Sequence, residues 1–172
     1  MGKNLTSACC RTGFPLCSKP AANAGVTCHQ EIMFREYFEE WKVRPEYSKE
    51  FVSLWKGWLG KENYHKLDEV TETEWSRFNK LLRKLGDEYS LELADCENQS
   101  LITISDVEQV LSSYDESMNK DSSMFTKLVI PELECIVSEE WDYTYIIWHK
   151  NNGAVEKLTP IIESIGLNHF HD

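Results

Sequence analysis

The chain has 172 residues, of which 41% are hydrophobic and 12% aromatic, and its formal net charge is −11 at pH 7. This composition suits one globular domain with a real core, and it excludes a wholly disordered, collagenous or low-complexity protein. No stretch approaches the roughly 18 consecutive apolar residues of a membrane-spanning helix, and no apolar run near the start resembles a secretory signal. We therefore expect a cytoplasmic protein.

Residues 1–29 differ from the rest in composition, because they are rich in glycine, proline and alanine and lack any helical or strand periodicity. They predict a flexible, cysteine-containing leader ahead of a single α+β domain over 30–172. The leader opens with Met-Gly-Lys-Asn-Leu-Thr, which makes Gly2 a candidate for N-myristoylation, and Cys9 and Cys10 could take palmitate. Over about ten residues it resembles the dually acylated leaders of peripheral signalling proteins. The leader therefore predicts a possible membrane tether.

The leader's cysteines offer a second reading, because thiolates and imidazoles are zinc ligands. Cys17, Cys28 and His29 are the candidate ligands there. Their spacing lacks the paired C-x₂-C turn of structural zinc sites, so we expect no metal. The chain also has no phosphate-binding loop and no dinucleotide-binding glycine motif, so we expect no cofactor.

Three helices are expected over about 30–86. Aromatic residues recur at three and four positions over 31–41, and an apolar stripe of the same spacing runs over 45–59. The third helix has the clearest signals. Thr71 and Glu74 form a capping box, and Gly86 is expected to end the helix in the left-handed conformation.

The apolar period shortens to two after Gly86, which predicts strands. We therefore expect a small, mainly antiparallel sheet over about 87–172, with helices packed on one face. The expected strands are 89–93, 101–104, 125–137 and 141–149, and the expected helices are 105–114 and 153–165.

Several details of this region are also expectations. We expect residues 115–123 to form a polar loop and 138–140 to form the turn of a hairpin. Pro131 is expected at a bulge or an edge position. Pro160 should kink or split the last helix, and Gly166 should end it. The final residues, including His169 and His171, are expected to fray, although two histidines so spaced could chelate a metal ion.

Charge is unevenly distributed along the chain. Residues 1–30, 31–85 and 86–172 carry net charges of +3, zero and −14. So acidic a surface repels phosphate backbones, and it attracts basic protein faces. We therefore expect no nucleic-acid binding and a basic protein partner.

Candidate partner-binding residues are aromatic and acidic. Two tryptophans three residues apart are typical of a binding face, and carboxylates bracket the expected hairpin. These candidates are Trp55, Trp58, Glu132, Glu134, Glu139, Glu140 and Asp142.

The leading hypothesis is a non-enzymatic adaptor or regulatory protein that docks a basic partner. One alternative is an inhibitor or immunity-type protein that covers the cationic site of a nuclease. Another is a hydrolase that uses Glu139, Asp142 and His149, since clustered carboxylates beside an imidazole can serve acid–base chemistry. A hydrolase would bury that cluster in a cleft, whereas a binding protein would display its acids.

Overall fold

The computed structural model describes residues 28–172, with side chains from residue 32 onward. In this part of the chain seven strands form one sheet in the order β5-β4-β6-β7-β8-β3-β9, and all neighbouring strands are antiparallel. The strands are β3 (Ser48–Ser53), β4 (Glu92–Asp95), β5 (Ser100–Thr103), β6 (Lys127–Ile130), β7 (Cys135–Glu140), β8 (Thr144–His149) and β9 (Asn168–Phe170). The predicted α+β class with a mainly antiparallel sheet is confirmed.

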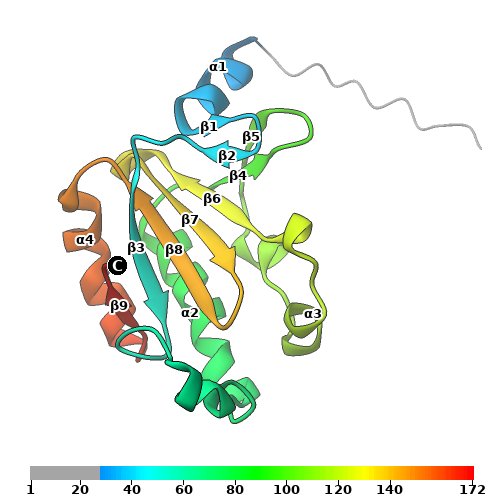
Figure 1. Ribbon diagram of the computed structural model, residues 1–172. Coiled ribbons are helices and arrows are strands. Elements are labelled where there is room, and N and C mark those ends of the chain that lie inside the picture. Colours follow the sequence, from blue (N-terminus) through cyan, green and yellow to red (C-terminus); the bar gives the residue numbers. More distant parts are fainter. Residues whose placement is uncertain (1–27) are drawn as a thin grey trace, which may run out of the picture.

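Two long helices, α2 (Glu72–Glu88) and α4 (Asn152–Ser164), cover one face of this sheet (Figure 1). Strand residues alternate between faces. The paired residues Val137 of β7 and Ile147 of β8 therefore face the helices and join the main core. Their neighbours along the strands point to the opposite face.

That opposite face is covered at one end by α1 (Cys28–Tyr37) and the small hairpin of β1 (Phe38–Glu39) and β2 (Lys42–Val43) (Figure 1). The rings of Phe34 and Phe38 stack with centroids 4.8 Å apart and pack over Val129 and Ile136 of the sheet. The other end of the face, below α1 in Figure 1, is not covered by α1 or by the hairpin, and a cavity lies there.

Short helical turns complete the fold, namely η1 (Lys61–Leu67), η2 (Val107–Val110), α3 (Tyr114–Met118), η3 (Ser122–Met124) and η4 (Pro131–Leu133). None of the helices in residues 28–172 is long and apolar enough to cross a bilayer. The predicted polar loop 115–123 thus contains α3 and η3. The helix expected over 105–114 is only the single turn η2, capped by Asp106.

Helix α2 agrees with its sequence signals except at its end. Thr71 accepts a hydrogen bond from the backbone N–H of Glu74, and the Glu74 carboxylate accepts one from the backbone N–H of Thr71. The helix continues through Gly86 to Glu88, so the prediction that Gly86 ends it is wrong. A Cβ at Gly86 would lie 3.3 Å from the Cβ of Val107, so this glycine lets η2 pack closely on the helix.

The expected helix over 45–59 is also wrong. Residues 48–53 form β3, and Trp55 and Trp58 lie in the irregular segment after it. The three- and four-residue spacing there mimics a helix by combining strand residues with loop residues. Because β3 is buried on both faces at its end, it shows no two-residue alternation that would have revealed a strand.

The hairpin turns also differ from expectation. The single strand expected over 125–137 is two strands, β6 and β7, joined by η4, which Pro131 begins. Residues 138–140 lie inside β7, and the β7–β8 turn is at Trp141–Tyr143.

At the C-terminal end, α4 continues as one helix past Pro160, so Pro160 does not split it. The carbonyl that Pro160 leaves without its helical partner is that of Glu156, whose exposed position leaves it open to water. Gly166 follows the helix with a φ of 78°, as predicted. The last residues do not fray. They form β9, which pairs with β3.

Candidate functional site

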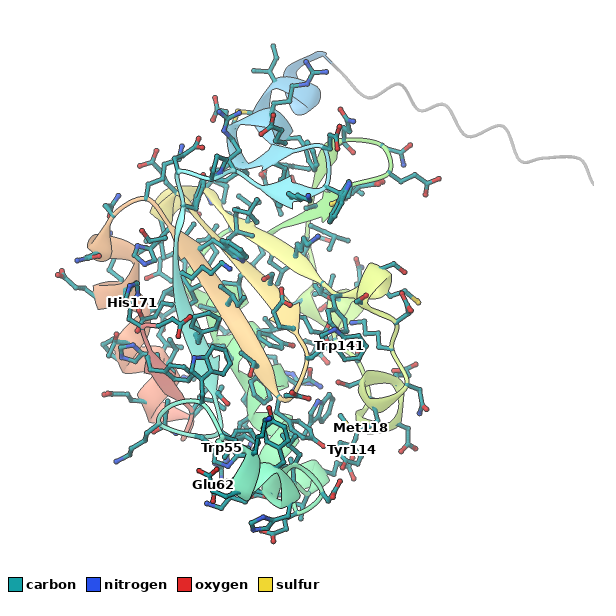
Figure 2. The ribbon with its side chains drawn as sticks, viewed as in Figure 1. Trp55, Glu62, Tyr114, Met118, Trp141 and His171 are labelled. Atoms are coloured by element: carbon teal, nitrogen blue, oxygen red, sulfur yellow. The ribbon has the colours of Figure 1, made fainter. Side chains whose placement is uncertain are left out.

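The pairing of β3 with β8 sets two irregular segments side by side. Ser53 is the Cα partner of Thr144, so the segment 54–60 leaves the sheet beside the turn that precedes β8. The Ser53 hydroxyl donates to the carbonyl oxygen of Tyr143 at 3.2 Å, which ties the two segments together. Figure 2 shows Trp55 and Trp141 at this same end of the sheet.

A cavity of about 250 Å³, here called the aromatic groove, opens between these segments on the face that α1 leaves uncovered. Six aromatic side chains and two carboxylates contribute to its walls. Its lining is Phe51, Ser53, Trp55, Gly57, Trp58, Leu59, Tyr64, Leu67, Glu140, Trp141, Asp142, Thr144, Ile146 and Phe170. Four of the sequence candidates, Trp55, Trp58, Glu140 and Asp142, therefore meet here.

Trp58 is held in place although 57% of it is exposed. Its ring stands edge-on to Phe51 at 4.6 Å and to Phe170 at 5.1 Å between centroids. The indole N–H donates to Oδ1 of Asp172 at 3.0 Å. A fixed, exposed indole can bind without first losing side-chain entropy.

The β7–β8 turn forms the opposite wall and has an unusual backbone. Asp142 and Tyr143 have φ values of 57° and 53°, which non-glycine residues rarely adopt. Such strain persists only where the surroundings fix it, and it gathers at functional sites. Here the Tyr143 hydroxyl donates to Sδ of Met118 at 3.3 Å, and the Tyr143 ring packs against Trp55. The turn leaves Trp141 58% exposed, with its ring edge-on to Phe125.

The charges lining the groove are negative. Glu140 is half-buried, and burial raises the pKa of its carboxyl group, although a hydrogen bond from Ser138 and the charges of Lys127 and Lys49 oppose the rise. The Ser138 hydroxyl is 3.4 Å from the Glu140 carboxylate, and no cation in residues 32–172 lies within ion-pair distance of it. The groove thus contains a carboxylate that is poorly solvated and only weakly compensated.

A second cavity lies on the other side of the β7–β8 turn, against α2 and α3. It shares Leu67, Glu140, Trp141, Asp142 and Thr144 with the aromatic groove and adds two acids, Asp68 and Glu139. Neither lining contains a lysine, arginine or histidine.

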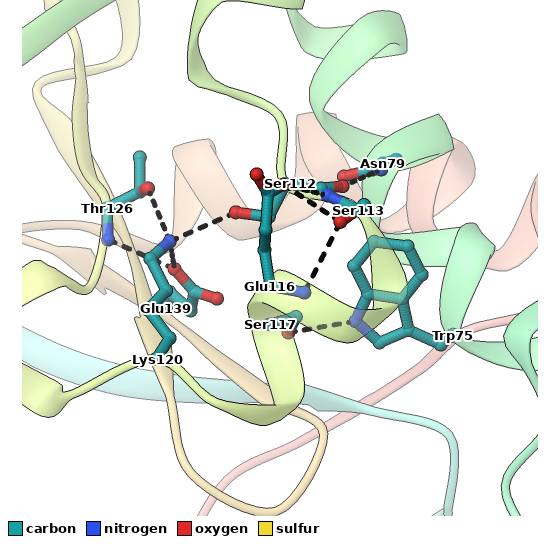
Figure 3. A network of polar contacts seen from close by, with 9 residues as sticks. All are labelled: Trp75, Asn79, Ser112, Ser113, Glu116, Ser117, Lys120, Thr126 and Glu139. Carbon is teal, nitrogen blue, oxygen red and sulfur yellow. Dashed lines mark hydrogen bonds and ion pairs between the residues drawn. The ribbon is translucent and has the colours of Figure 1, made fainter.

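Glu139, however, is already paired within the protein. Its carboxylate accepts from Nζ of Lys120 at 2.5 Å and from the backbone N–H of Thr126 at 3.1 Å (Figure 3). The Lys120 side chain also donates to the hydroxyls of Ser112 and Thr126. The pair, with side chains 12% and 8% exposed, therefore fastens the 112–126 segment to β7, which leaves Glu139 a structural role.

The other acidic candidates lie at the far end of β7. The Glu132 carboxylate accepts from the backbone N–H of Ser90 at 2.9 Å, and Glu134 follows η4 in the left-handed conformation. Both residues are exposed and neither lines the groove.

The three residues of the hydrolase hypothesis are not brought together. Glu139 pairs with Tyr145 in the sheet, whereas His149 lies opposite Cys135, four residues along β8. The Nδ1 atom of His149 is 3.0 Å from the carbonyl of Asn151, and its buried Nε2 has no hydrogen-bond partner in the described part of the chain. Asp142 belongs to the turn at the opposite end of β8.

The two C-terminal histidines meet the buried carboxylate of Glu50. Nδ1 of His169 is 2.6 Å from Oε1 of Glu50, and Nδ1 of His171 is 3.6 Å from Oε2. Figure 2 shows His171 on the α4 side of the sheet. Among residues 32–172, no three histidine, cysteine or carboxylate side chains are arranged to hold a metal ion. The remaining candidates, Gly2, Cys9, Cys10 and Cys17 and the side chains of Cys28 and His29, lie outside the described residues.

The other walls of the groove could hardly be recognised from the sequence. The apolar spacing around Phe51 predicts a helix, and the position of Phe170 near the end of the sequence predicts fraying. The alternation of polar and apolar side chains over His169, Phe170 and His171 is nevertheless typical of a strand. Tyr64 had no signal at all.

Comparison of the chain with protein-family models, with curated proteins and with solved structures finds no match. What the groove binds must therefore follow from its own chemistry.

Removal of the Lys120 cation tests the structural role of Glu139. We expect Lys120→Met to lower the free energy of unfolding by about 3 kcal/mol, because it leaves a buried carboxylate without its cation. Adding Glu139→Gln should recover part of that loss, since a neutral amide needs no cation. Urea titration of the single and double variants measures both effects. Lys80→Met, at an exposed site, is the control, and an equally small loss for Lys120→Met would contradict the role.

Proposed function

We propose that the protein is a non-catalytic binding protein, an adaptor or regulator, that docks a basic surface of a protein partner at the aromatic groove. One observation carries the proposal. The two cavities that flank the β7–β8 turn are lined by aromatic rings and by four carboxylates, of which only Glu139 forms an ion pair within residues 32–172.

Exposed, immobilised tryptophans support this reading. Tryptophan is among the residues that contribute most to protein interfaces, especially in a pocket from which water is expelled. Trp58 and Trp141 stand on opposite walls of the groove, each fixed by edge-on contact with a phenylalanine. A partner that covers both would bury a large apolar area without ordering new side chains.

The charge of the chain supports a basic partner. Residues 86–172 carry a net charge of −14, and these residues include the acidic wall of the groove. Negative potential of this size attracts a cationic protein from a distance and raises its rate of association. An inhibitor that covers the cationic site of a nuclease would be one form of the same docking.

The proposal extends to location. We place the docking domain in the cytoplasm, where acylation of Gly2 together with Cys9 or Cys10 would hold it at a membrane, because a single myristoyl chain binds only marginally. The intact mass of the protein purified from its native host tests this extension. We expect the added mass of a myristoyl group, and an unmodified Gly2 would contradict the tether without affecting the docking proposal.

Binding of defined peptides tests the docking proposal. We expect the full chain to bind a short peptide that alternates serine and arginine, and not its serine–glutamate counterpart, in a titration followed by tryptophan fluorescence. Affinity should fall as salt rises from about 0.05 to about 0.3 M, because the attraction is partly screened. Trp58→Ala should weaken binding by about 2 kcal/mol. Equal binding of the two peptides would contradict the proposal.

Neutralising Glu140 should separate binding from stability. Burial raises the pKa of Glu140 in the folded chain. Ionisation of Glu140 therefore opposes folding once the pH rises above the pKa that this carboxyl group has in the unfolded chain. Glu140→Gln should therefore raise the thermal midpoint at neutral pH while it weakens peptide binding. The gain should vanish below about pH 4, where the carboxyl is protonated in both states.

Glu97→Gln is the matched control, since Glu97 is exposed in the β4–β5 connection, outside the groove. It should change neither property. A loss of stability in the Glu140→Gln variant at neutral pH would contradict this prediction, because it would mean that the Glu140 charge stabilises the folded state.

A further inference from the structure

We propose that the aromatic groove is a receptor for one arginine side chain of the basic partner, whose guanidinium lies on the exposed indoles and donates hydrogen bonds to Glu140 and Asp142. The inference rests on the proposed docking function and names the group that the groove recognises. Three independent features of the described residues support it.

The first feature is the distribution of cations over aromatic rings. Outside the groove, three rings are each covered by a lysine of the chain itself: Lys42 lies 4.7 Å from the centroid of Trp41, Lys49 lies 4.8 Å from Trp148, and Lys150 lies 5.0 Å from Tyr47. Within residues 32–172, no lysine or arginine covers a ring of the groove in this way.

Trp41 makes the comparison direct, because it is 57% exposed, like Trp58. The Trp41 indole already has the ammonium group of Lys42 over its ring, whereas the indoles of Trp58 and Trp141 are open to a cation from outside. A cation over an indole gains about 0.5–2 kcal/mol, and more as water is excluded.

The second feature is the pair of acids in the lining. Glu140 is half-buried with a long hydrogen bond from Ser138. The Thr144 hydroxyl donates to the main-chain carbonyl of Asp142, but within residues 32–172 no donor is bonded to the Asp142 carboxylate. A cation that enters the groove would supply the charge and the donors that both lack. On the other face of β7, Glu139 needs no cation from outside, because Lys120 already forms an ion pair with it.

The third feature is size. The groove measures about 250 Å³, which is below the roughly 300–1,000 Å³ of pockets that enclose drug-sized ligands. It suits a single long side chain. Arginine fits better than lysine, because a planar guanidinium can lie flat on an indole while its N–H groups reach two carboxylates, and an ammonium cannot do both.

Matched peptides test the inference on the full chain. We would titrate a short glycine–serine peptide with one central arginine against versions in which that residue is lysine or citrulline, the neutral isostere of arginine. Indole N–H resonances of Trp55, Trp58 and Trp141 report the site. We expect the arginine peptide to bind about tenfold more tightly than the lysine peptide, and the citrulline peptide to cause no shift.

Variants locate the effect. Trp58→Ala and Glu140→Gln should each weaken arginine binding about tenfold or more. Trp41→Ala, at a tryptophan as exposed as Trp58, and Glu97→Gln, at an exposed glutamate, lie outside the groove and should leave it unchanged. Each folded variant keeps its far-ultraviolet circular dichroism, which separates lost binding from lost structure.

The failures of the two proposals are distinguishable. The serine–arginine peptide could bind while the citrulline and arginine peptides have equal affinity, or while the indole N–H resonances of the groove do not shift. Either result would overturn the arginine receptor and leave the docking of a basic partner standing. If neither the serine–arginine peptide nor the single-arginine peptide binds, both proposals are overturned.

Discussion

The register of β3 against β8 is the constraint on which the candidate site depends. Six consecutive residue pairs, from Ser48–His149 to Ser53–Thr144, fix these two strands relative to each other. A slip of one residue would exchange the two faces of β3 and separate the two walls of the groove. The groove is therefore a consequence of the core, because the strands that form it are the same ones that pack on α2 and α4.

Neighbouring carboxylates on β7 show how the fold assigns different roles to similar residues. Glu139 and Glu140 point to opposite faces of one strand. The first is matched by Lys120 and secures a loop, whereas the second is left with one long hydrogen bond at the wall of a cavity. A poorly compensated charge costs stability, and proteins keep such sites mainly where binding needs them. The strained turn at Asp142 and Tyr143 lies at the same place.

Much of the fold could be predicted from the sequence, and much of the site could not. The capping box at Thr71, the change of period after α2 and the β7–β8 pairing follow from local chemistry. β3 could not be recognised, because Phe51 and the tryptophans after it imitate the spacing of a helix. The side-chain chemistry of Trp55, Trp58, Glu140 and Asp142 marks them as candidates in the sequence, and only the sheet shows that they meet. That Glu139 is occupied, and that Phe170 helps to build the groove, depend on contacts between residues far apart in the chain, which no local pattern records.

The C-terminal strand forms the side of the groove with the shortest ladder. β9 joins the sheet through three residue pairs at an edge, with Phe170 under Trp58 on one face and His169 against Glu50 on the other. So short a ladder opens more readily than the central strands do. Loss of β9 would take the Phe170 support away from Trp58 while it leaves the β3–β8 pairing in place, so the integrity of the groove depends on the last few residues of the chain although the sheet does not.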